Sequence, residues 1–195
     1  MKVYLAGPDV FLRDAIDIGR LKAEICARHG LTGQFPLDNK VNVESRGASR
    51  KIFLGNKAMM DEAGAIIANL TPFRGPSADA GTVYELGYMA GSEKLCIGYS
   101  NDPSLYVKRV AKFSSIGKRG KRLVDREDLT VENFDLPDNL MIIHALNIHG
   151  CPLIVPKQAP KDIWHDLASF EACVRLAAKR LRAAPKPARA APKPG

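Results

Sequence analysis

The segment AIIANLTPFRGPSADAGTVYELGY, residues 65–88, decides how this chain folds. Residues 63–70 form an apolar run of strand length, a Pro/Arg/Gly/Ser cluster then indicates a loop, and residues 82–89 begin a helical pattern. A strand, a loop and a helix in this order are the repeating unit of a parallel α/β sheet. Open sheets of this kind bind ligands at the carboxyl ends of their strands, so the loop is the expected place for a site.

Two carboxylates, Asp79 and Glu85, follow this loop. With Asp79 as the N-cap, Glu85 lies about two turns into the helix, and helical spacing brings both side chains near one crevice. Gly81 allows a ligand to approach the backbone closely. In the alternative interpretation, Asp79 only caps the helix and Glu85 is a solvated helix residue, and spacing does not separate the two.

The rest of the chain alternates strands and helices, as a doubly wound fold requires. We expect strands at residues 2–6, near 34–35, and at 65–70, 95–99 and 151–155, and helices at 11–29, 48–62, 81–92, 104–112, 137–149 and 161–181. Residues 101–133 form a long polar segment, which is typical of a lid or a binding loop. The sequence therefore predicts an α/β fold, flavodoxin-like or Rossmann-like, with a five-stranded parallel sheet flanked by helices.

Composition indicates one domain followed by a basic tail. The 195 residues are 46% hydrophobic and 26% charged, which is enough for one core. Residues 175–195 contain seven Lys or Arg and no acid, so the remainder carries only +1 of the net +8. This distribution argues against nucleic-acid binding. We expect one folded domain at residues 1–182 and a disordered Ala/Pro/Lys-rich tail at 183–195, because the tail cannot bury enough apolar surface.

The sequence shows no signal for a membrane or a metal. No stretch approaches the length of a membrane span, and the first residues lack the basic and apolar regions of a secretory signal, so we expect a cytoplasmic protein with no membrane partner. Cys26, Cys96, Cys151 and Cys173 lie far apart without paired metal spacing, and we interpret them as buried reduced thiols. We expect neither a metal nor a cofactor.

Residues 65–88 resemble the signature of the nucleoside 2-deoxyribosyltransferase family, and three further segments agree. They are VYLAGPDVF (3–11), similar to the family's first strand and base-binding turn, FPLDN (35–39), similar to its second strand-to-loop element, and VENF (131–134) followed by NLM (139–141), similar to its late Asn-Leu-Met motif. The resemblance covers residues 1–155 in order. It implies transfer of 2-deoxyribose between the nucleobases of 2′-deoxynucleosides, so these nucleosides and free nucleobases are the expected partners.

The resemblance implies a role for each residue that matches a motif on the sugar side. Glu85 is the nucleophile that forms a covalent ester with the sugar, Tyr4 orients its carboxylate, and Asp79 accepts a hydrogen bond from the sugar 5′-hydroxyl. A carboxylate at position 79 would repel a 5′-phosphate, so free nucleosides are expected in preference to nucleotides. Without the resemblance, Tyr4 reads as a half-buried strand tyrosine.

On the base side, the resemblance places Asn56 near the base or its leaving proton. An amide is not a strong acid, so proton delivery would then fall to water or another group. Asp9 and Phe11, together with the segment that contains Asp38, are expected to wall the base pocket. Phe11 offers a stacking face.

Asn139 and Met141 match family residues that reach the active site of a neighbouring subunit. This implies a homodimer or a higher homo-oligomer with shared active sites. From the residues alone, Asn139 could simply cap the following helix, and Met141 could belong to the core.

Two other functions stay open at this stage. An N-glycosidase acting on nucleosides or nucleotides would use the same Glu85 ester and resolve it with water. A non-catalytic nucleotide-sensing module would bind nucleosides without turnover, since a fold does not fix a function. The sequence also leaves open whether purines alone or both classes of base are accepted.

Overall fold

The computed structural model describes residues 1–39 and 41–183. The expected disordered tail at 183–195 lies outside these residues, apart from Ala183, which ends the last helix. Across the two described ranges, every helix falls short of the length and hydropathy needed to cross a membrane.

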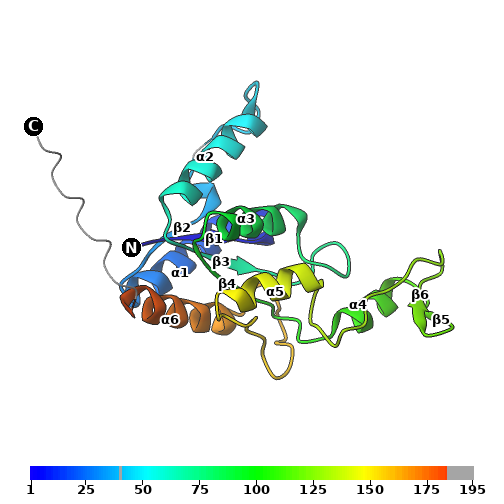
Figure 1. The fold of residues 1–195 in the computed structure, drawn as a ribbon. Helices are drawn as coiled ribbons and strands as arrows, with labels where there is room; N and C mark the ends of the chain where they lie inside the picture. Colours follow the sequence, from blue (N-terminus) through cyan, green and yellow to red (C-terminus); the bar gives the residue numbers. More distant parts are fainter. Residues whose placement is uncertain (40, 184–195) are drawn as a thin grey trace, which may run out of the picture.

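A parallel sheet of four strands in the order β2-β1-β3-β4 forms the centre of the molecule (Figure 1). The strands are β1 (Lys2–Ala6), β2 (Thr32–Gln34), β3 (Ala65–Asn69) and β4 (Leu95–Tyr99). All five residues of β3 are buried, as expected of a parallel strand covered on both faces. The order is that of a flavodoxin-like sheet, whose switch point lies between β1 and β3.

Helices cover both faces of the sheet, so the predicted doubly wound α/β class is confirmed. On one face, α1 (Ala15–Arg28) and α6 (Ala168–Ala183) pack over the strands. On the other face lie α2 (Ala48–Glu62), α3 (Ala80–Gly91) and α5 (Leu140–Ile148) (Figure 1). Side chains of β1 alternate between the two layers: Val3 and Leu5 face α1 and α6, and Tyr4 faces α3.

The expected fifth strand at residues 151–155 is the part of the sheet that was predicted wrongly. Only a single parallel bridge joins Ile154 to Tyr99 there. Ile154 N donates to Gly98 O at 3.0 Å, and Ser100 N donates to Ile154 O at 3.0 Å. Pro152 and Pro156 flank the bridge and have no N–H to donate, so the ladder cannot extend.

Three helices begin at least three residues later than expected. The helix expected from residue 11 begins at Ala15, after a 3₁₀ turn η1 (Pro8–Phe11), and the helix expected from 137 begins at Leu140. The helix expected from residue 161 begins at Ala168. The side chain of Asp162 accepts hydrogen bonds from the backbone of Trp164 and His165, which favours a turn over a helix there.

The long segment at 101–133 has structure of its own. It contains α4 (Tyr106–Phe113) and an unexpected antiparallel hairpin of β5 (Gly117–Arg119) and β6 (Arg122–Val124). Gly120, at a φ of +60°, helps the chain to reverse between the two strands. The hairpin projects from one end of the molecule beyond α4 (Figure 1). Its expected role as a lid stays a prediction.

Candidate active site

A cavity of about 330 Å³ lies where β1 and β2 end and α3 begins. This volume falls within the range of small-molecule sites. Its walls come from the turn after β1, the segment after β2, one side of α2 and the first two turns of α3. Five of the expected site residues line it together: Phe11, Asn56, Asp79, Gly81 and Glu85.

Glu85 and Tyr4 form the central contact of the site. The Tyr4 hydroxyl donates a hydrogen bond of 2.6 Å to Glu85 Oε1. Tyr4 is wholly buried in the middle of β1, and its side chain lies on the α3 side of the sheet. Burial and the neighbouring negative charge of Glu85 raise the pKa of Tyr4 well above its usual value. Tyr4 is therefore a fixed hydrogen-bond donor to the carboxylate.

The surroundings of Glu85 raise its pKa to about 7. Burial is the largest cause, and the negative charge of Asp79 acts in the same direction. Hydrogen bonds from Tyr4 and Asn56 stabilise the carboxylate and offset part of this rise. At neutral pH the group is thus divided between a protonated and an ionised form.

Asp79 caps α3 and lines the cavity at the same time. Its Oδ2 accepts hydrogen bonds from Thr82 N at 2.9 Å and from Thr82 Oγ1 at 3.0 Å. Within the described residues, Oδ1 accepts no hydrogen bond. The two sequence interpretations of Asp79 are therefore compatible, because capping occupies one oxygen and the side chain still borders the cavity.

The side of the cavity where a base was expected to bind is mostly apolar. Phe11 is 56% exposed and stacks on Phe73, with ring centroids 5.3 Å apart. The rings of Trp164 and Phe73 meet edge to face, with centroids 6.1 Å apart. The structure thus holds Phe11 in a short aromatic stack at the edge of the cavity.

Asp9 and Asp38 do not line the cavity, although both were expected in the base pocket. Asp9 is 1% exposed and is paired with the buried Lys22, whose Nζ lies 2.8 Å from Asp9 Oδ2. Asn69 Nδ2 also donates to both carboxylate oxygens of Asp9 at 3.1 Å. Asp38 turns back on its own segment and accepts a 2.8 Å hydrogen bond from Phe35 N. Local partners hold both carboxylates away from the ligand space.

Asn139 and Met141 also lie outside this chain's cavity. Asn139 caps α5, with Oδ1 accepting from Met141 N at 3.0 Å and Nδ2 donating to Glu132 Oε1 at 2.8 Å. Met141 is 71% exposed, so the alternative of a core methionine is wrong.

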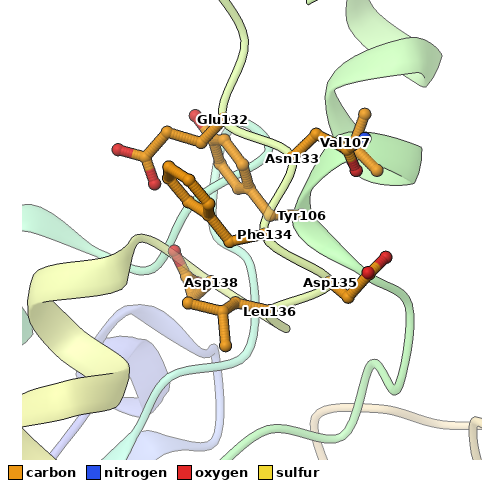
Figure 2. Close-up of a pocket in the computed structure, with 8 residues that line it drawn as sticks. All are labelled: Tyr106, Val107, Glu132, Asn133, Phe134, Asp135, Leu136 and Asp138. Carbon is orange, nitrogen blue, oxygen red and sulfur yellow. The ribbon is translucent and has the colours of Figure 1, made fainter.

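The segment just before Asn139 borders α4. Figure 2 shows Glu132, Phe134 and Asp138 of this segment beside Tyr106 of α4. The space between them is about 10 Å³, room for no more than one water molecule. A buried ion pair of 2.9 Å between Arg109 and Asp138 fixes the segment to α4.

Two features in and near the cavity were not predicted from the sequence. Val41, Val43 and Ile52 supply apolar wall from the loop before α2 and from α2 itself. The buried ion pair of Lys22 with Asp9 was also missed. Lys22 stands on the apolar face of α1, four residues after Ile18, and this position was the signal that could have revealed it.

The fold and the cavity define a small α/β protein with a carboxylate-lined cavity at the switch point of its sheet. A sequence profile of the nucleoside 2-deoxyribosyltransferase family matches residues 3–141, and the chain belongs to this family. The match takes in β1, the first two turns of α3 and the start of α5.

One relative in sequence and two solved structures are similar to this chain. The chain is 37% identical over 116 residues to an uncharacterized protein of Schizosaccharomyces pombe, a match that covers 57% of this chain and 55% of that protein. The chain thus spans about half the length of this curated relative. A 2-desoxiribosyltransferase from Leishmania mexicana superposes with a TM-score of 0.59 at 27% identity, over 89% of this chain and 96% of its own. A conserved protein from Enterococcus faecalis shares the fold, with a TM-score of 0.55 at 15% identity over 91% of this chain and 98% of its own.

Proposed function

We propose that this protein transfers the 2-deoxyribosyl group between the nucleobases of 2′-deoxynucleosides through a covalent ester on Glu85. The observation that carries the proposal is the hydrogen bond from the buried Tyr4 to Glu85, a carboxylate that lines a nucleoside-sized cavity. Membership of the family and the likeness to the Leishmania mexicana protein support it.

The reaction proceeds as a double displacement. One carboxylate oxygen of Glu85 attacks the anomeric carbon, the N-glycosidic bond breaks, and its electron pair leaves with the base. A second base then attacks the same carbon, and Glu85 departs as a carboxylate. Because Tyr4 binds Oε1, Oε2 is the oxygen available for attack.

Asp79 selects free nucleosides. Its side chain borders the cavity six residues before Glu85, where it can accept a hydrogen bond from the 5′-hydroxyl. A 5′-phosphate at the same place would bring two negative groups together in a partly desolvated site. Nucleotides are therefore poor substrates.

An exchange assay tests this function. The enzyme is incubated with a 2′-deoxynucleoside and a different free base, and the new deoxynucleoside and free 2-deoxyribose are both quantified. Transfer produces the new nucleoside, whereas an N-glycosidase produces free sugar alone, and a sensing module produces neither. A slow-reacting sugar analogue should label Glu85, and the Glu85→Gln variant should take up no label. Label on another residue would remove Glu85 as the nucleophile.

The proposed active unit is a homodimer or a higher homo-oligomer with shared sites. Asn139 and Met141 stand outside their own chain's cavity, and the exposure of Met141 leaves it accessible to a second copy. Mixing inactive Glu85→Gln subunits with inactive Met141→Lys subunits should restore part of the activity, because one site of each mixed dimer is then complete. No restored activity in subunits shown to exchange, or a fully active monomer, would contradict shared sites.

A further inference from the structure

The base side of the cavity contains hydrocarbon and amide groups but no acid among the described residues. Among the described lining residues, Asp79 and Glu85 are the ionisable ones, and both belong to the start of α3. The opposite walls are formed by side chains such as Val10, Phe11, Leu37 and Val43 and by the amides of Asn39 and Asn56.

Neither carboxylate is available to protonate a leaving base under the proposed function. Glu85 must be ionised to attack the sugar, and it receives the Tyr4 hydrogen bond in that form. Asp79 Oδ2 accepts two hydrogen bonds from Thr82, and under the proposed function Asp79 accepts a further one from the 5′-hydroxyl, so its place is on the sugar side and not beside the base. The Tyr4 hydroxyl already donates a hydrogen bond to Glu85, and Tyr4 is wholly buried.

Asn56 occupies the position from which an acid could have acted. Its amide is close enough to Glu85 to stabilise the carboxylate, and its Oδ1 is buried with no hydrogen-bond partner in the described part of the chain. An amide can donate and accept hydrogen bonds, but it does not transfer a proton at neutral pH. The polar group beside the reacting bond can therefore bind a base but not protonate it.

We propose that the base leaves without a proton from any of the described side chains that line the cavity, and that Asn56 thereby restricts the enzyme to donors whose base is a good leaving group. This inference rests on the proposed function. The electron pair of the N-glycosidic bond stays on the base nitrogen, and water supplies the proton after departure. A negative charge that develops against apolar walls is poorly solvated, so the rate depends steeply on the acidity of the base N–H. Substituted purines and pyrimidines with electron-withdrawing groups are the preferred donors.

The test measures base release in a single turnover for donors whose bases differ in N–H acidity. For the unmodified enzyme we expect the rate to fall by close to tenfold for each unit of increase in the pKa of the base N–H. The Asn56→Asp variant introduces an acid at the same place. General acid catalysis contributes about 10²-fold or more, so this variant should raise the rate of poor donors relative to good ones by at least about tenfold below neutral pH.

A donor that needs no proton provides the matched control. The base of 7-methyl-2′-deoxyguanosine is already cationic and leaves as a neutral molecule, so Asn56→Asp should give no gain with it. If the rate of base release in the unmodified enzyme depends only weakly on the pKa of the base N–H, the inference is overturned. It is also overturned if Asn56→Asp turns over the 7-methyl donor but its rate depends on that pKa as steeply as before. A steeper dependence in Lys40→Ala would also overturn it, since Lys40, outside the described residues, would then supply the proton. If bases are exchanged but the rate depends weakly on the pKa of the base N–H, this inference alone is wrong. If no donor releases its base, the proposed function is wrong as well.

Discussion

Replacing Tyr4 by Phe should move the acidic limb of the pH profile to higher pH. Loss of the 2.6 Å hydrogen bond removes a group that stabilises ionised Glu85, whose pKa burial raises to about 7. A hydrogen bond to a charged group contributes about 1.5–3 kcal/mol, and about 1.4 kcal/mol corresponds to one pH unit. The limb should therefore move up by about one to two pH units.

The same shift fixes the expected loss of activity. At pH 7 roughly half of Glu85 is ionised in the unmodified enzyme, against about 1–10% in Tyr4→Phe, so kcat/KM should fall about 5- to 50-fold. Most of the activity should return near pH 9.5, because the nucleophile is then ionised again.

The assay is kcat/KM for base exchange from pH 5 to pH 10. Tyr88→Phe is the matched control. Tyr88 lies one turn after Glu85 on α3, and its hydroxyl donates a hydrogen bond to Asp61, outside the cavity. That variant should keep the profile of the unmodified enzyme. An equal loss of activity at every pH in Tyr4→Phe, with no displacement of the limb, would refute the role of Tyr4 in setting the ionisation of Glu85.

Three further changes test the site and its support. Glu85→Gln should raise the free energy of unfolding by about 2 kcal/mol more at pH 8.5 than at pH 5.5, measured with urea. The pKa of Glu85 is about 7 in the folded protein, against an ordinary value of 4.5. The unmodified protein therefore has its full stability below pH 4.5 and loses part of it as the pH rises through 7, whereas a glutamine does not ionise. An equal gain at both pH values would contradict this. Asp9→Ala should lower the free energy of unfolding by about 3–5 kcal/mol, because Lys22 would stay buried without its carboxylate; a cost under about 1 kcal/mol would show that the pair is not needed. Gly55→Ala should raise KM for the nucleoside while kcat is kept, because the new methyl group would collide with Asn39 and push its amide into the cavity; an unchanged KM would show that Asn39 can move elsewhere.

The sequence predicted the sheet and its helices best where one strong pattern acted alone. The helix at 48–62 and the strand at 95–99 have the predicted bounds, because an amphipathic run and a short apolar run each favour one structure. The fifth strand was predicted from the apolar residues at 151–155, but Pro152 and Pro156 lack the N–H groups that a longer ladder needs. The late start of α6 depends on hydrogen bonds made by Asp162, a local competition that periodicity does not register.

The site shows a similar division. Spacing brought Asp79 and Glu85 to one cavity, because both lie on the first turns of a single helix. Spacing along the sequence could not show that Asp9 is buried outside the cavity while Glu85 lines it. That difference depends on the opposite faces of β1: Tyr4 reaches Glu85 on the α3 side, whereas Asp9 meets Lys22 of α1. Contacts between distant segments decide such assignments, and only the assembled sheet provides them.

The buried carboxylate must serve two opposed steps of the proposed reaction. Burial makes Glu85 more basic and therefore a better nucleophile toward the sugar, yet the same property makes it a poorer leaving group when the second base attacks. The hydrogen bond from Tyr4 acts against burial, because it stabilises the departing carboxylate more than the neutral ester. A pKa near 7 is the balance between these two influences. Tyr4→Phe should therefore slow breakdown of the ester more than its formation at high pH, and labelled enzyme should accumulate during turnover. An unchanged steady-state level of the ester would show that Tyr4 acts on attack alone.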